Sequence, residues 1–540
     1  MKVCLLYADR ERANAEPYYD TKSIIQDLGL ESLFLAAAKA ITYENGELKK
    51  LEEADPYLID TMRSVMMVPL ASQEEITFRQ EVIADCRKAP DMIRGLYRVS
   101  SAMLQRWNEL GRGIRARIRQ GNPVMKLTTE IRVLHLFCNS LTEVRGLLEQ
   151  QENLSSPGFL AFREEFYRVF SHEREEFIRK ILDDIAFYTD GLDRKDEGRD
   201  LVVRPRIVFE CGLEDGLKFS RLKLEEVSSR STKFLRRGST REKLQKFLDS
   251  RIPDSFPVLE DERIREQTQI LEYGIVNYLV RRLKGFTDEF QSFFDQLKLQ
   301  SAFYLAAVQM MEQMKRLGMG WCFPQVCDRR DLEFEDLKEF VMGIEQRVNV
   351  IGNTCSLLQK DLLIVTGANQ GGKSTFLRSI GIAQVMMQCG LPVTARSFRS
   401  GIFPRIFVHF TRREDSEMNS GRLDEELGRM NGIVEHIGDG SLVLLNESFA
   451  TTTEKEGSVI AYDIIRALKE AGVRILTVTH LLSFARRVRE ETKDRPDSGV
   501  EFLSAERLPD GRRTYRMIRS EPELTSFGLD LYDSIVGVVS

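Results

Sequence analysis

The sequence predicts an α/β C-terminal domain on a mostly parallel sheet, preceded by a mostly α-helical region with a small β-rich insertion. Three observations support this. After Phe334, apolar strand-like runs alternate with helical segments of about 10 to 20 residues. Through most of the preceding chain, apolar residues recur at three- and four-residue steps. Near Gly191 short β-branched runs replace that helical period. We therefore expect three parts: residues 1–120, 121–333 and 334–540.

The first part, residues 1–120, is expected to be helical from about Ile24 to Gln120. The stretch TFRQEVIADCRKAPDMIRGLYRVSSAMLQRW carries the helical period, and Pro90 is expected to break it into two helices.

The second part, residues 121–333, is expected to hold long helices on both sides of a β-rich insertion at about 195–255. Helical periodicity runs from Leu127 to Tyr188 and again from Arg263 to Leu317. Between Gly216 and Ser250 there are 10 Lys/Arg against 4 Asp/Glu, a local balance of +6. The insertion therefore combines strand-like alternation with local positive charge.

Composition narrows the class of protein. Hydrophobic residues at 42% and charged residues at 30% describe a globular protein, and 540 residues suggest more than one domain. The net charge of -5 excludes a globally basic surface, so nucleic acid would need a local patch. The 8 cysteines form no CxxC pair, which is typical of a reducing cytosol. There is no signal-peptide-like start and no apolar run of about eighteen residues. We expect a cytoplasmic protein without a membrane span.

The stretch GANQGGKS fits the phosphate-loop template G-x-x-x-x-G-K-[ST] at every fixed position. It lies between the apolar run LLIV and a helix expected to begin at Lys373. Loop amides and the helix N-terminus would hold phosphate oxygens, Lys373 would reach the β- and γ-phosphates, and Ser374 would ligate Mg²⁺. A glycine-rich turn without a ligand is the weaker interpretation, since strand, loop and helix follow in the required order. The predicted ATP-binding residues are Gly367, Ala368, Asn369, Gln370, Gly371, Gly372, Lys373, Ser374 and Thr375.

Two later strand ends supply candidate catalytic groups. SLVLLNES ends with Asn446 and Glu447, and Glu447 could act as general base toward the attacking water. Asn446 stands where an aspartate normally supports the metal, and its amide oxygen could accept a hydrogen bond from a Mg²⁺-bound water. VRILTVTH places His480 after another strand, where it could sense the γ-phosphate. An ordinary strand-end carboxylate and a structural histidine are the competing interpretations.

These residues resemble the MutS family of mismatch-repair ATPases. The similar segments, in chain order, are VIGNTCSL, TGANQGGKSTFLR, QCGLPVTA, FPRIFVHFT, SLVLLNESFATTTEKEG, TVTHL and SFGLDLYDSIVG. The resemblance implies an ABC/MutS-type P-loop ATPase domain over residues 334–540 and adenine contact by the segment containing Asn353. It further implies a core and lever region before that domain, with the β-rich insertion as a DNA clamp.

Two departures qualify the resemblance. The family's signature loop usually reads Ser-Thr-Phe ahead of Glu-Met, whereas NSGRLDEEL offers Ser420 and Gly421 before Glu426-Leu427. A counterpart of the mismatch-reading N-terminal domain, with its Phe-x-Glu wedge, is not found, so the chain resembles a shortened member. The expectation is a homodimer that couples ATP hydrolysis to low-specificity binding of duplex or branched DNA, in repair or recombination.

The candidate DNA-binding residues lie in the basic insertion. They could neutralise phosphates without reading bases, although a solvated basic loop explains them equally well. The residues concerned are Arg230, Lys233, Arg236, Arg237 and Arg241. For the second basic cluster, GRGIRARIRQG, a solvated helix face is the favoured interpretation.

Two other functions stay open. One is a nucleotide-dependent interaction switch with little ATP turnover and no mismatch recognition, which Asn446 favours. The other is a different ABC-type ATPase, such as a transporter subunit, which the missing LSGGQ sequence and the long helical half disfavour.

Overall fold

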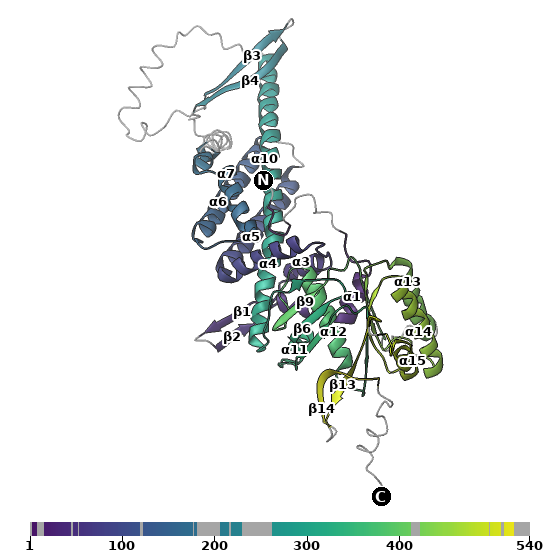
Figure 1. The fold of residues 1–540 in the computed structure, drawn as a ribbon. Helices are drawn as coiled ribbons and strands as arrows, with labels where there is room; N and C mark the ends of the chain where they lie inside the picture. The colour runs from purple at the N-terminus through teal and green to yellow at the C-terminus, as the bar shows by residue number, and fades with distance from the viewer. Residues whose placement is uncertain are drawn as a thin grey trace, which may run out of the picture. The chain divides into compact units, whose positions relative to one another are not determined.

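The computed structural model describes most of the chain, and Figure 1 shows its helices and strands. The described residues are 3–7, 16–44, 47–51, 53–118, 123–176, 178–180, 206–214, 218–228, 262–411, 422–495, 497–508 and 512–522. The chain divides into two compact units. The division of the chain into three parts stays a prediction from sequence.

The first unit, residues Met1–Val3, Gly95–Glu152 and Arg163–Lys298, is mainly helical. Its helices come wholly or partly from α5 (Pro90–Ile118), α6 (Pro123–Glu149), α7 (Pro157–Val169) and α10 (Glu262–Arg316). On α6, Leu127, Ile131 and Leu134 follow the helical period and form a buried cluster with residues of α10 that include Leu283 and Phe290. The helical period in the sequence therefore corresponds here to a row of apolar side chains on one face of α6 that is buried in the core.

The first unit also contains an antiparallel strand pair at the predicted insertion. β3 (Arg206–Glu214) pairs with β4 (Lys218–Ser228), and the register shifts twice along the ladder. Strands therefore occur where β structure is predicted, and their assignment as a clamp stays a prediction.

The second unit, residues Cys4–Arg94, Asn153–Phe162 and Leu299–Ser540, contains both larger sheets. Its N-terminal part holds the helices α1 (Thr21–Leu28), α2 (Leu30–Ala37), α3 (Pro56–Met66) and α4 (Gln73–Lys88). Helix α4 ends at Lys88 and α5 begins at Pro90, so the predicted break at Pro90 is confirmed.

One part of the first segment is not helical, contrary to the prediction. β1 (Ile41–Glu44) and β2 (Glu47–Leu51) form an antiparallel pair in which Glu44 lies opposite Glu47. The sequence Asn45-Gly46 stands between them, and Asn-Gly is a strong hairpin signal. This local turn preference outweighs the helical period of the surrounding residues.

The principal sheet of the second unit has six strands in the order β10-β11-β12-β8-β13-β14. Its first five strands are parallel and β14 is antiparallel, so the predicted mostly parallel sheet is confirmed. The strands are β8 (Leu362–Thr366), β10 (Ile406–Phe410), β11 (Leu442–Asn446), β12 (Arg474–Val478), β13 (Val500–Arg507) and β14 (Arg513–Arg519).

Helices cover both faces of this sheet (Figure 1). α13 (Arg422–His436), α14 (Glu454–Glu470) and α15 (Leu482–Thr492) lie together on one face and share a buried core with it. On the other face, α12 (Lys373–Gln388) packs so closely that a Cβ at Gly381 would lie 2.7 Å from Leu444 of β11. The result is a three-layer α/β arrangement.

A second, four-stranded sheet has the order β5-β9-β6-β7. Its strands are β5 (Gln325–Val326), β6 (Leu332–Leu337), β7 (Asn353–Leu357) and β9 (Ser397–Ser400). The short helix α11 (Phe340–Gln346) lies in the chain between β6 and β7. Across the described residues of both units, no helix is long and apolar enough to cross a bilayer.

Candidate nucleotide site

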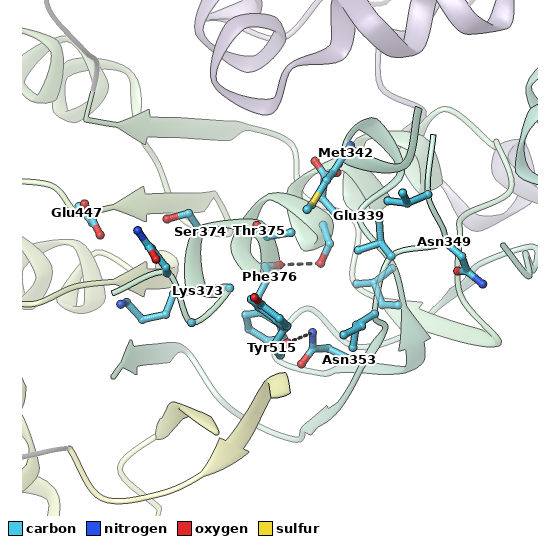
Figure 2. Close-up of a pocket in the computed structure, with 18 residues that line it drawn as sticks. Glu339, Met342, Asn349, Asn353, Lys373, Ser374, Thr375, Phe376, Glu447 and Tyr515 are labelled. Atoms are coloured by element: carbon cyan, nitrogen blue, oxygen red, sulfur yellow. Dashed lines mark hydrogen bonds between the residues drawn. The ribbon is translucent and has the colours of Figure 1, made fainter. Parts of the chain in front are cut away.

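A cavity of about 380 Å³ lies at the carboxyl ends of the parallel strands, where open α/β sheets bind ligands. Lys373, Ser374 and Glu447 lie at one end of the cavity, and Asn349 and Asn353 at the other (Figure 2). The loop and helix start after β8 contribute Lys373 and Ser374 to the first of these ends, and the position after β11 contributes Glu447. The sheet therefore brings two distant sequence motifs to one cavity.

The phosphate-binding template folds as a loop that needs its glycines. Gly367 has φ of 113° and Gly372 has φ of 91°, a region that side chains with a Cβ rarely adopt. A Cβ at Gly367 would lie 2.9 Å from the main-chain nitrogen of Ala505, and one at Gly371 would lie 2.7 Å from the Cβ of Ala505. β13 thus packs directly against the loop, which leaves room only for glycine.

Lys373 is the first residue of α12, as predicted, and its side chain is 4% exposed. Its Nζ donates hydrogen bonds to the main-chain oxygens of Gly367 at 2.8 Å and Ala368 at 2.9 Å. These bonds hold the ammonium group on the loop. Ser374 and Thr375, the next two residues, also line the cavity.

The remaining loop residues differ in where they lie. Gln370 lines the cavity, is exposed, and accepts a hydrogen bond from Arg513 at 2.8 Å. Asn369 is also exposed, while Ala368 is 8% exposed. Neither Asn369 nor Ala368 is among the described residues that line the cavity.

Glu447 lines the same cavity as Lys373. It follows β11 with φ of 54°, its N–H donates to Val478 at 2.8 Å, and its main-chain oxygen accepts from the Thr411 hydroxyl at 2.7 Å. The backbone of Glu447 is therefore tied to both neighbouring strands, β10 and β12.

Asn446, the last residue of β11, carries an orphaned acceptor. Its Oδ1 is buried and has no hydrogen-bond partner among the described residues. A buried amide oxygen without a donor is costly. Waters bound to a hard cation such as Mg²⁺ would donate hydrogen bonds to this amide oxygen. The Ser374 hydroxyl is a suitable direct ligand of such an ion. The oxygen chemistry of both side chains suits Mg²⁺. Ser374 lines the cavity, whereas Asn446 is not among the described residues that line it, so their binding of one ion stays a prediction.

His480 follows β12 and is half-buried. It is not among the described residues that line the cavity, unlike Lys373 and Glu447. Its role toward the γ-phosphate stays a prediction.

Asn353 lines the cavity, but both ends of its side-chain amide already make hydrogen bonds within the protein. Nδ2 donates to the main-chain oxygen of Tyr515 at 3.2 Å, and Oδ1 accepts from the main-chain nitrogen of Met517 at 2.8 Å. Asn353 therefore fastens β7 to β14, where Tyr515 also lines the cavity.

Tyr515 and Glu339 are among the cavity residues that sequence reasoning missed. Tyr515 is half-exposed with φ of 60°, and Met342 and Ile351 add apolar lining. Glu339 is 1% exposed, and burial raises the pKa of its carboxyl group to about 7. No motif marks either position, because both reach the cavity from elements that pack beside the loop.

The five candidate DNA-binding residues, from Arg230 to Arg241, lie outside the described residues. So do Ser420 of the signature loop and the segment SFGLDLYDSIVG.

Comparison with known proteins places two family models on successive parts of the chain. The MutS2 N-terminal domain model matches residues 71–317, and the MutS domain V model matches residues 363–532. The second match contains the phosphate loop and the strand ends described above.

Individual relatives match only part of the chain. The DNA mismatch repair protein MutS of Synechococcus sp. (strain CC9605) is 36% identical over 166 residues, 30% of this chain and 18% of that protein. The MutS of Microcystis aeruginosa is 29% identical over 209 residues, 37% of this chain and 23% of its own length. Endonuclease MutS2 of Streptococcus sanguinis is 30% identical over 163 residues, 30% of this chain and 20% of that protein.

The matched region thus spans about a fifth of the length of these relatives. The two family models nevertheless agree with each other, with the resemblance carried by the motifs and with the α/β fold around the cavity. On these grounds the chain is similar to MutS-family proteins in both its helical region and its α/β region.

Proposed function

We propose that the chain is an ATP-dependent DNA-binding protein, acting in DNA repair or recombination, that hydrolyses ATP at a site shared by two protomers. The observation that carries the proposal is that Lys373 and Glu447 line one cavity. A phosphate-binding lysine and a carboxylate at the end of a second strand are two of the groups on which hydrolysis of a triphosphate depends.

The residues divide the reaction between them. Loop amides and Lys373 bind the β- and γ-phosphates. To reach them, the Nζ of Lys373 gives up its hydrogen bonds to the carbonyls of Gly367 and Ala368. Glu447 accepts a proton from the attacking water, and Ser374 and Asn446 would hold Mg²⁺, directly and through water. The ion, when bound, neutralises charge on the phosphate oxygens. Tyr515 and Ile351 supply an apolar surface for the adenine ring.

The DNA part of the proposal rests on the basic insertion and on what the relatives' names state. Proteins named DNA mismatch repair protein MutS are similar to this chain over 166 and 209 residues. Lys and Arg residues near Arg236 and Arg237 would neutralise phosphates of duplex or branched DNA, with little sequence preference. ATP would favour a closed pair of protomers, through tighter binding to that state than to the open one.

Steady-state ATP hydrolysis tests the proposal. Glu447→Gln is expected to lower turnover by about 100-fold or more while ATP binding persists, because only the proton acceptor is lost. Glu470→Gln, an exposed residue of α14, is the matched control. Turnover unchanged by Glu447→Gln would remove Glu447 from its role.

DNA binding is tested on homoduplex, mismatched duplex, a four-way junction and single strands, with and without ATP. Arg236→Glu combined with Arg237→Glu is expected to weaken binding to all duplex forms and to flatten the salt dependence. Unchanged binding would show that the basic insertion is not the DNA site.

A second candidate function, a nucleotide-dependent interaction switch with little turnover, is favoured by Asn446. An amide brings no charge to the metal, so hydrolysis would be slower while ATP binding by the loop is kept. ATP binding without measurable hydrolysis would favour this candidate.

A further inference from the structure

The turn that carries Glu447 has an unusual backbone. Glu447 and Phe449 have φ of 54° and 66°, in the left-handed region that residues with a Cβ avoid. Such conformations persist where the surrounding contacts fix them. The direction of the Glu447 side chain therefore depends on what holds this turn.

Helix α13 supplies the first contact, through the carboxylate of Glu426. This side chain is 6% exposed. Its Oε1 accepts a hydrogen bond from the main-chain nitrogen of Phe449 at 2.6 Å, and its Oε2 accepts one from the Thr451 hydroxyl at 2.7 Å. A buried carboxylate is costly unless its oxygens are satisfied, and here residues of the turn satisfy both.

Strand β10 supplies the second contact, through the fully buried ring of His409. Its Nδ1 lies 2.7 Å from the Ser448 hydroxyl and its Nε2 lies 3.3 Å from the main-chain oxygen of Glu426. The Ser448 hydroxyl also lies 3.1 Å from the main-chain oxygen of His409, so its one proton has two acceptors within reach. When that proton goes to Nδ1 of a neutral ring and the Nε2–H donates to the Glu426 carbonyl, both ring contacts are satisfied. One ring thus joins the turn to α13.

We infer that Glu426 and His409 are positioning residues that aim Glu447 at the attacking water. The inference rests on the proposed function, since it concerns the general-base role of Glu447. Neither residue is among the described residues that line the cavity. Losing either contact is therefore expected to change turnover and not nucleotide affinity.

The size of the expected effect follows from geometry. A general base must lie within hydrogen-bond reach of the water it activates, and a displacement of about 1 Å can cost about 100-fold in rate. Glu426→Ala frees both Phe449 and Thr451. Glu426→Gln keeps one acceptor oxygen and presents an amide donor to the other contact, so its effect is intermediate.

The first test measures ATP affinity and kcat on the full chain. Glu426→Ala is expected to lower kcat by about 10- to 100-fold and leave the Kd for ATP within about twofold. Glu425→Ala, the exposed neighbour on the same helix, is the matched control with unchanged kcat. If Glu426→Ala does not fold, Thr451→Val, which removes one hydrogen bond, is expected to give a smaller loss of kcat at unchanged Kd.

The second test is a double-mutant cycle with Glu447→Gln. If Glu426 acts through Glu447, Glu426→Ala adds little to the loss already caused by Glu447→Gln. Equal kcat in Glu426→Ala and Glu425→Ala, or fully additive losses in the cycle, would overturn the inference while the proposed function stands. An unsubstituted chain that fails to bind ATP, or turnover indifferent to Glu447→Gln, would instead overturn the proposed function and the inference with it.

Discussion

The side-chain amide of Asn353 donates a hydrogen bond to the main-chain oxygen of Tyr515 at 3.2 Å. The same amide accepts from Met517 at 2.8 Å, so β14 is held on both sides of Arg516. Asn353 is 8% exposed, whereas Tyr515 is 47% exposed at the cavity. The asparagine thus acts on the cavity by fixing the strand that presents the tyrosine.

Asn353→Ala is expected to weaken ATP binding by about 10-fold, because the buried Met517 N–H loses its acceptor, at a cost of about 1–3 kcal/mol, and Tyr515 loses its fixed position. Titration with ATP and with inorganic triphosphate measures the effect. Affinity for triphosphate should hold, since the phosphate loop is untouched. Ser356→Ala, an exposed position on the same strand β7, is the control, and an equal loss for both ligands would contradict this account.

Gly371→Ala is expected to reduce ATP affinity by at least about 10-fold, because the new Cβ would meet the Ala505 Cβ at 2.7 Å. Ala505→Gly removes that atom and should restore much of the affinity in the double variant. The same partner change should not rescue Gly367→Ala, where the obstacle is the Ala505 main-chain nitrogen at 2.9 Å and a φ of 113°. Gly146→Ala, with nothing within 4 Å, serves as the control. Rescue of both loop variants would show that side-chain crowding alone fixes the loop.

Glu339 should make stability depend on pH. Burial raises the pKa of its carboxyl group from 4.5 to about 7, partly opposed by Met342 N–H and Arg378. The folded chain then binds more protons than the unfolded chain between these values, so the contribution of Glu339 to the free energy of unfolding falls as pH rises from about 4.5 to about 7.

Glu339→Gln should remove this decline and raise the free energy of unfolding at pH 8 by about 1–3 kcal/mol, because no buried charge then forms. Denaturant unfolding of both proteins at pH 5, 6, 7 and 8 measures the difference. Glu470→Gln, an exposed glutamate of α14, is the control. Parallel pH profiles for the unsubstituted chain and the Glu339→Gln variant would contradict the assignment.

Asn446→Asp is expected to raise turnover at limiting Mg²⁺ by about 10-fold, because a carboxylate binds a Mg²⁺-bound water more strongly than the orphaned amide oxygen does. The measurement is ATP hydrolysis across a Mg²⁺ titration. Asn431→Asp on the exposed face of α13 should change nothing. A lower rate in Asn446→Asp would mean that its negative charge beside Glu447 opposes catalysis.

Much of the ATPase region is predictable from sequence because its signals are local. The run LLIVTGANQGGKS specifies a buried strand, a glycine-dependent loop and a helix start, and the structure has all three in place. The runs before Glu447 and His480 likewise form the strands β11 and β12. The hairpin of β1 and β2 was missed, although Asn45-Gly46 was a readable signal.

The amino-acid sequence alone determined the phosphate loop, the parallel strands and the resemblance to the MutS family, since each depends on short motifs of neighbouring residues in fixed order. Only the tertiary structure decided that Glu447 shares a cavity with Lys373 and that Asn353 is hydrogen-bonded to β14. The same holds for the hydrogen bonds of Glu426 and His409 to the turn after β11. These contacts join residues from about 20 to more than 160 positions apart, and strand order and helix packing bring them together.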